Sequence, residues 1–286
     1  MDTRFIDSFV VVAECGSIAE ASRRLNMTPS ALAQRIRVLE QDFGVPLLTR
    51  SGRYVSVTEA GMRLLAQSRN FQREVKKLKD AATNQDFIGG LQIGSIRTAL
   101  TNVVPTLLRR AISIHPGLNV FIEAGMSEAL YHEVAGGKLD AAVIVAPPFR
   151  IPKSLVWHSL RHEPLVVLCP RSLSDVDGLT ALKTLPLVRY DRRGWGGSLA
   201  DQYLLAADIQ PSERIELDSL DGILALIGME LGVSLIPDWF SPLPLPQNIT
   251  TLPLHDDVPY REVGMLCPVQ SPYSRLFEQM ISGTGA

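Results

Sequence analysis

The sequence has few cysteines and no long apolar run, and both absences restrict the kind of protein it can form. Its 286 residues contain three cysteines, Cys15, Cys169 and Cys267, far apart and without CxxC spacing. This argues against a disulfide framework and a zinc site. The apolar stretch at residues 9–13 is too short for a spanning helix or a secretory signal. We expect a cytoplasmic protein with no membrane partner, no metal and no cofactor.

Charge of one sign is also scarce, since the formal net charge is only −2. The balance nevertheless differs along the chain. Residues 1–80 hold 13 Lys+Arg against 9 Asp+Glu, and the remainder holds 15 against 21. A basic amino-terminal end favours a nucleic-acid partner for that end, although an excess of four charges does not decide the matter.

The first sixty residues predict three helices. The first carries Phe9 and Val12 and stops at Gly16. Ser17, with Glu20 three residues later, has the spacing of a capping box and begins the second helix, which runs to about Leu25. Thr28-Pro29 begins the third, because threonine accepts a hydrogen bond at the N-cap and proline needs no amide donor at the first position. Gly44 ends it.

The third helix has one apolar and one polar face. Leu32, Ile36 and Leu39 recur at the helical period and predict the buried stripe. The other face carries Ser30, Gln34, Arg37 and Gln41. Such a helix, after a short turn, fits a DNA major groove about 12 Å wide. Taken alone, the polar face slightly favours a solvated surface over a DNA-reading one.

Residues 46–57 read as two short strands around Ser51-Gly52, which predicts a wing bearing Arg50 and Arg53. Thr58 then begins a long helix to about Thr83. Heptad spacing on this helix predicts a seam that pairs two subunits. The residues of this dimerisation seam are Leu64, Phe71, Val75 and Leu78.

Beyond a hinge at residues 86–90, short apolar runs alternate with helices, which predicts a largely parallel sheet covered by helices. Strands are expected at residues 91–95, 118–123, 141–146, 165–169, 185–190, 214–217, 233–236 and 262–267. Helices are expected at residues 102–114, 127–135, 198–207, 219–231 and 272–281.

The amino-terminal stretch resembles the LysR-type transcriptional regulators in residues that keep a fixed order over about fifty positions. They are Phe9 to Ala13, Gly16 to Ala21, Leu25, Thr28 to Ile36, Leu39-Glu40, Phe43-Gly44, Leu47-Leu48, Arg50, Arg53, Thr58 and Ala60-Gly61. The remainder is similar more loosely. Those matches are Leu91 to Gly94, Pro105, Pro116, Gly137 to Ala141, Pro164-Leu165 and Leu231 to Pro237.

The resemblance implies an α/β effector domain of the type-2 periplasmic binding protein fold, with two lobes, behind a mainly α winged helix-turn-helix domain and a long linker helix. The expected domains are 1–58 for DNA binding, 59–90 for the dimerisation linker and hinge, and 91–286 for inducer binding. Lobe I would comprise 91–162 plus 266–286, and lobe II 163–265. Two strands, near 161–165 and 262–265, would cross between the lobes. Homodimers or homotetramers are implied, and RNA polymerase is a further partner that such a regulator allows.

The same resemblance assigns the residues expected to contact the double-stranded DNA operator. Ser30 and Gln34 are the candidates for base edges, because hydroxyls and amides read base donors and acceptors. The candidates for phosphate contacts and for setting the start of the helix are Thr28, Pro29, Arg35, Arg37, Arg50 and Arg53.

For the inducer, three segments follow predicted strands and precede helices, where free amides collect. They are Ser95 to Thr98, Gly125 to Ser127 and Tyr190 to Arg193. They should face one cleft between the lobes and bind a small organic anion. The candidate effector-binding residues are Ser95, Arg97, Thr98, Ser127 and Arg192.

Three alternatives remain open. A periplasmic solute-binding protein shares the second fold but has no use for residues 1–60. For an enzyme, none of the candidate groups lies in a catalytic motif. These groups are His115, His132, His158, His162 and Cys169. A redox sensor of the same fold would use Cys169 and Cys267, since the two crossing strands are neighbours, although a thiol in an apolar strand is usually inert.

Overall fold

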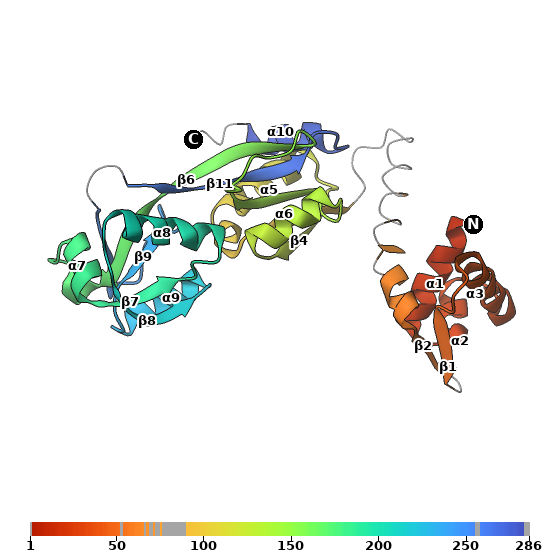
Figure 1. Ribbon diagram of the computed structural model, residues 1–286. Helices are drawn as coiled ribbons and strands as arrows, with labels where there is room; N and C mark the ends of the chain where they lie inside the picture. Colours follow the sequence, from red (N-terminus) through yellow and green to blue (C-terminus); the bar gives the residue numbers. More distant parts are fainter. Residues whose placement is uncertain are drawn as a thin grey trace. The chain divides into compact units, whose positions relative to one another are not determined.

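The computed structural model describes residues 2–51, 54–65, 67, 68, 71, 75, 90–254 and 258–282, except for the side chains of Arg50 and Ser51. The chain divides into two compact units, residues 1–85 and 86–286. Each is described by itself (Figure 1). Within the described residues, no helix is long and apolar enough to cross a membrane.

The amino-terminal unit begins with the three predicted helices, α1 (Thr3–Cys15), α2 (Ile18–Arg24) and α3 (Pro29–Phe43). Their ends follow the expected chemistry. Gly16 and Gly44 close α1 and α3 with φ of 61° and 69°, a conformation that glycine adopts without strain. Ser17 and Thr28 cap α2 and α3 by accepting from backbone amides. Glu20 differs from the predicted capping box, because its carboxylate pairs with Arg23.

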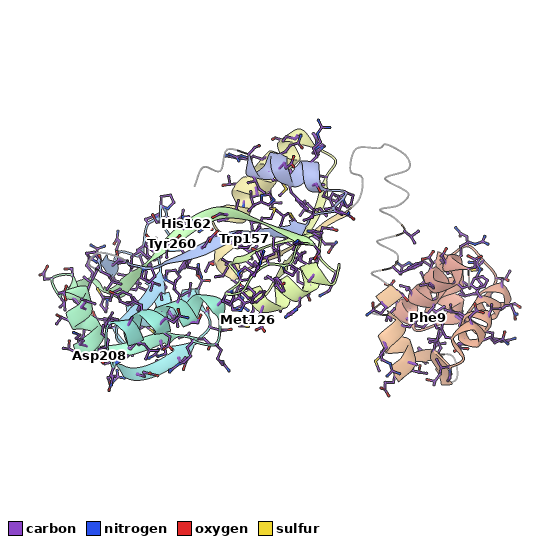
Figure 2. All side chains as sticks on the ribbon, turned by 45° about the horizontal axis from the view of Figure 1, so that its top comes forward. Phe9, Met126, Trp157, His162, Asp208 and Tyr260 are labelled. Carbon is purple, nitrogen blue, oxygen red and sulfur yellow. The ribbon has the colours of Figure 1, made fainter. Side chains whose placement is uncertain are left out.

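The three helices pack around a small apolar core, and the hairpin of β1 (Leu48–Ser51) and β2 (Tyr54–Val57) lies beside them. Phe9, Leu32 and Leu39 are fully buried in this core. Phe9 is labelled in Figure 2. The unit is therefore a helical domain with an antiparallel wing, as the sequence predicts.

In the second unit, lobe I is built on three parallel strands: β3 (Gly90–Ser95) lies between β4 (Asn119–Ala124) and β5 (Ala141–Val145). The short helix η1 (Arg97–Leu100) follows β3 directly. Helices α5 (Val103–Ile114) and α10 (Ser274–Ile281) pack against each other, and α6 (Ser127–Ala135) packs on β5. A continuous apolar core joins these elements.

Two long antiparallel strands, β6 (Leu155–Pro170) and β11 (Tyr260–Pro268), run side by side between the lobes (Figure 1). Pro268 is opposite Leu155 and Tyr260 is opposite Pro164, with an irregularity between Val263 and Gly264. The sequence predicted a crossing near 161–165 and a strand at 165–169, so β6 begins six residues before that crossing and ten before that strand. The sheet is also mixed rather than largely parallel, because β6 pairs antiparallel with each of its neighbours.

Lobe II contains the outer half of β6, which pairs with β9 (Ser234–Pro237) and β10 (Ile249–Leu252). Strands β7 (Pro186–Tyr190) and β8 (Ser212–Leu217) form a separate parallel pair. The helices of this lobe are η2 (Arg171–Leu173), α7 (Gly178–Thr184), α8 (Trp195–Ala206) and α9 (Leu220–Gly228). The sequence did not predict α7 or β10. Both are short, with seven and four residues, and short segments carry little periodic signal.

Candidate nucleic-acid interface and ligand cavity

The outer face of α3 presents polar side chains that make no contact with the core. Ser30, Gln34 and Arg37 are exposed, and their spacing of four and three residues places them on one face. Thr28 accepts from the Ala31 amide at 3.2 Å, and Pro29 is the first helical residue. This face of α3 therefore presents an amide and a hydroxyl that can contact base edges, and one guanidinium that can contact the phosphate backbone of DNA.

Arg35 lies apart from that face. Its Nη1 donates to the Ser8 hydroxyl at 3.2 Å, and its guanidinium lies 5.9 Å from the centre of the Phe5 ring. Both partners belong to α1. Arg35 therefore joins α3 to α1. The sequence did not predict this contact and counted Arg35 among the phosphate-binding candidates.

The base of the wing is held by two side chains, Glu40 and Thr58, for which the sequence predicted no contact with the wing. Glu40 of α3 accepts from the amides of Leu47 and Leu48 at 2.8 and 3.1 Å. Thr58 donates to the Pro46 carbonyl and accepts from the Gly61 amide, at 2.8 and 3.0 Å. The predicted wing arginines lie outside the described residues, Arg53 entirely and Arg50 in its side chain.

The four residues of the predicted dimerisation seam have different surroundings. Leu64 packs against the core of the amino-terminal unit, so part of its burial is supplied within one chain. Phe71 is 38% exposed and Val75 is half-buried. Leu78 lies outside the described residues.

A cavity of about 160 Å³ lies between lobe I and lobe II. Its walls include residues from all three segments that the sequence singled out, together with the start of α9 and one residue of β11. The residues from those segments are Ile96, Arg97, Thr98, Gly125, Met126, Ser127, Tyr190, Asp191 and Arg193.

Two hydroxyls in the wall of lobe I are buried, and each already accepts a hydrogen bond. Thr98 Oγ1 accepts from Arg261 Nη2 at 3.2 Å, and Ser127 Oγ accepts from the Val145 amide at 3.1 Å. Both residues are 8% exposed. Among the described residues neither hydroxyl has an acceptor for its own proton. These two groups can therefore donate to an acceptor atom in the cavity.

Helices α6 and α8 begin at the cavity, and their N-cap residues, Met126 and Gly194, supply no capping side chain. Their first amides and positive dipole ends favour an anionic group. The two glycines after Trp195 allow the first turn of α8 to pack closely against Tyr190 and Asp191. A Cβ on Gly197 would lie 1.9 Å from the Asp191 carbonyl oxygen, and one on Gly196 would lie 3.0 Å from the Tyr190 hydroxyl.

Arg261 of β11 is the buried cation of the cavity, and the sequence analysis missed it. It is 2% exposed and lines the wall. Its Nε donates to Glu163 at 2.7 Å, directly across the strand pair, and Arg161 Nε lies 3.2 Å from the other Glu163 oxygen. Its Nη2 donates to the Thr98 hydroxyl of lobe I at 3.2 Å, and Tyr190 of lobe II lines the same cavity.

Burial dominates the titration of these groups. It raises the pKa of the Glu163 carboxyl, against the opposing effect of Arg261 and Arg161. It also raises the pKa of Tyr190.

The sequence did contain a signal for this charged cluster, since Arg161, Glu163 and Arg261 lie in or next to two strands that were expected to be neighbours.

Two of the predicted effector residues, Ser95 and Arg192, do not line the cavity, so the prediction was wrong about their position. Ser95 is fully buried beneath it, and its hydroxyl donates to the Ile96 carbonyl at 2.9 Å. Arg192 points to the surface of β8, where it pairs with Glu213 and Glu216 at 2.6 and 3.1 Å. Arg193, not Arg192, lies at the cavity.

The expectation that Cys169 and Cys267 lie close together is wrong. Cys267 is opposite Val156 on β6, and Cys169 lies thirteen residues further along that strand, opposite Thr250. At about 3.3 Å per residue, this is a separation of tens of ångströms along the strand, whereas a disulfide needs Cα atoms within about 7 Å. Burial raises the pKa of both thiols, that of Cys267 to about 11.

Two of the histidines considered for catalysis lie beside other side chains. The ring centres of His162 and Tyr260 lie 4.3 Å apart with the rings tilted by 43°, and the two residues lie side by side on the crossing strands (Figure 2). His115 lies 3.4 Å from Gln279. In the part of the chain that the structure describes, no three His, Cys, Asp or Glu side chains are arranged to hold a metal ion.

Two family models match the chain. The model of the LysR substrate binding domain matches residues 84–282, and that of the bacterial regulatory helix-turn-helix protein, lysR family, matches residues 3–62. The HTH-type transcriptional regulator IlvR of Caulobacter vibrioides is 31% identical over 246 residues, covering 83% of this chain and 82% of its own. CzcR of Bacillus cereus is 27% identical over 239 residues, covering 83% and 80%.

Solved structures share the fold. Full-length CbnR in complex with its target DNA is 20% identical, with a TM-score of 0.73 and 100% of each chain covered. A full-length OxyR variant from Pseudomonas aeruginosa is 23% identical, with a TM-score of 0.66, covering 99% of this chain and 94% of its own.

Proposed function

The chain belongs to the LysR family of bacterial transcriptional regulators, and we propose that a small organic anion bound between lobe I and lobe II controls its activity on DNA. The family supplies the DNA-binding and effector-binding domains. The ligand class and the residues that bind it are the proposal. It is carried by the two buried hydroxyls of Thr98 and Ser127, whose protons are free to bind an acceptor.

A carboxylate fits these donors better than a neutral group. Hydrogen bonds to a charged acceptor contribute about 1.5–3 kcal/mol each, roughly twice the neutral value. The uncapped start of α6 and the exposed guanidinium of Arg97 act in the same direction. Arg261 is held by Glu163, so it polarises Thr98 rather than providing an uncompensated charge.

Ligand binding would act through the contacts that join the lobes. Trp195 of lobe II lies beside Tyr131 and Phe149 of lobe I, with ring centres 6.2 and 5.7 Å apart. Asn102 of lobe I donates to the Trp239 carbonyl of lobe II at 2.6 Å. A ligand that contacts both walls favours one arrangement of the lobes, and its effect on DNA binding equals its difference in affinity between arrangements.

The outer face of α3 would read the operator. CbnR, which shares the fold, has been solved in complex with its target DNA; here the exposed hydroxyl of Ser30 and amide of Gln34 are the groups that would contact base edges. Phe71 and Val75 would pair two subunits, so that two copies of α3 read a partly palindromic site. A regulator of this kind acts on DNA in the cytoplasm, and RNA polymerase is a further partner. We propose no catalytic role for any residue.

The test is calorimetry with small carboxylates, from acetate to hexanoate together with succinate and benzoate. Thr98→Val keeps the shape of the side chain and removes the donor, and Ser127→Ala removes the second. Every carboxylate that binds should lose about tenfold or more in affinity for each variant. Ser113→Ala is the control, since Ser113 is exposed on α5 and bonds only to Arg110. Unchanged affinity in both cavity variants would refute the site.

A further inference from the structure

The charged residues of the cavity are divided unequally between its walls. Three arginines face four carboxylates, so the lining as a whole is not positive. The basic residues are Arg97, Arg193 and Arg261, and the acidic ones are Glu128, Asp191, Asp218 and Asp221. Because the lining has no positive excess, it favours a ligand that carries a positive group in addition to the carboxylate of the proposed function.

Two of the arginines are already neutralised. Arg193 makes a forked pair with Asp191, Nε to Oδ1 at 3.0 Å and Nη2 to Oδ2 at 2.9 Å. Arg261 is held by Glu163 at 2.7 Å. Arg97 and Glu128 remain in lobe I and offset each other.

In lobe II, Asp218 and Asp221 remain. Both are exposed, and within the described part of the chain neither carboxylate has an ion-pair partner. They do not cap α9, because Ser219 does so by accepting from the Gly222 amide at 3.1 Å. Lobe II therefore presents two more carboxylates than arginines to the cavity, whereas lobe I presents the hydroxyl donors.

The rest of the wall is apolar, from Ile96, Met126, Val145, Trp195 and Leu220. We propose that the ligand is an amino acid with an apolar carbon skeleton. Its carboxylate is bound by Thr98 and Ser127 on lobe I, and its ammonium group by Asp218 and Asp221 on lobe II. This rests on the proposed function, since it names the ligand of that same cavity.

The experiment compares matched probes on the full chain by calorimetry. Valine, leucine, isoleucine, methionine and 5-aminopentanoate are each measured beside the carboxylate that lacks the amino group. At least one amino acid should bind about fivefold or more tightly than its partner, the size expected for two partly exposed ion pairs. In the double variant Asp218→Asn, Asp221→Asn that preference should disappear, while affinity for the simple carboxylate should not fall, because the change removes two negative charges from the cavity.

The matched control is Asp208→Asn. Asp208 is exposed in lobe II with φ of 50°, which asparagine tolerates. It does not line the cavity, and Figure 2 shows it apart from Met126, which does. It should change nothing, and melting temperatures show whether each variant is folded.

The outcomes separate the two proposals. Carboxylates that bind at least as tightly as their amino acids would overturn the amino-acid assignment and leave the anion site standing. A preference that survives in the double variant would overturn the role of Asp218 and Asp221. Failure of every probe to bind would overturn both proposals.

Discussion

The polar face of α3 and the ligand cavity place their functional groups in opposite ways. On α3, Ser30, Gln34 and Arg37 come from one helix, are exposed and have no role in the core. In the cavity, Thr98, Ser127 and Arg261 come from three segments and are buried, with bonds to other parts of the protein. Substitution on α3 should therefore change recognition alone, whereas substitution in the cavity should change stability as well.

The largest effect should follow from removing Arg261. Arg261→Met leaves Glu163 buried with only Arg161 beside it, and breaking a buried pair costs about 3–5 kcal/mol. Urea unfolding measures this free energy. The double variant Arg261→Met, Glu163→Met should recover a large part of the loss, because the unpaired buried charge is gone.

Arg214→Ala provides the control for this experiment. Arg214 is exposed on β8, and such a surface change should stay within about 0.5 kcal/mol. An Arg261 variant as stable as this control would contradict the difference drawn between the exposed face and the cavity.

The next effect concerns the amino-terminal unit. If Phe71 is buried between two subunits, Phe71→Asp forfeits about 1.5–3 kcal/mol of apolar burial for each copy and raises the dimer dissociation constant by at least tenfold. Sedimentation at several concentrations measures it. Gln67→Asp introduces the same charge at an exposed position of the helix that follows Thr58, and it should leave the mass of the protein in solution unchanged. Equal behaviour of the two variants would remove Phe71 from the seam.

A smaller effect should separate base reading from backbone contact on α3. Gln34→Ala should cost about 1–3 kcal/mol of discrimination at one base pair, whereas Arg37→Ala should weaken binding to all sequences and reduce the salt dependence by about one phosphate contact. Binding to operator and to unrelated DNA at several salt concentrations distinguishes them. Neither change should alter the urea midpoint, since both side chains are exposed. The same loss of discrimination from both would merge the two roles.

The smallest effect concerns the reactivity of the three cysteines towards alkylating agents and oxidants. The pKa of Cys267, about 11, leaves it with roughly 300-fold less thiolate at neutral pH than an ordinary thiol of pKa about 8.5. Alkylation of the folded protein should therefore modify the half-buried Cys15 first. The variant Cys15→Ser should react only on unfolding. A disulfide between Cys169 and Cys267 after peroxide treatment would contradict the strand register itself.

The sequence by itself determined the features that depend on neighbouring residues. Ser17, Thr28 and Gly44 mark helix ends, and Leu32 and Leu39 mark the core face of α3, because caps and helical periodicity are local. The polar face of α3 follows from the same period. The three segments that reach the cavity were also predictable, since each follows a strand and precedes a helix.

Only the tertiary structure decided which side chains meet across long separations. Arg261 contacts Glu163 because β6 and β11 pair in one register, and that register also separates Cys169 from Cys267. Arg192 turns to Glu213 and Glu216, whereas its neighbour Arg193 lines the cavity. Register and side-chain direction are set by packing between segments distant in sequence, and no local pattern encodes them.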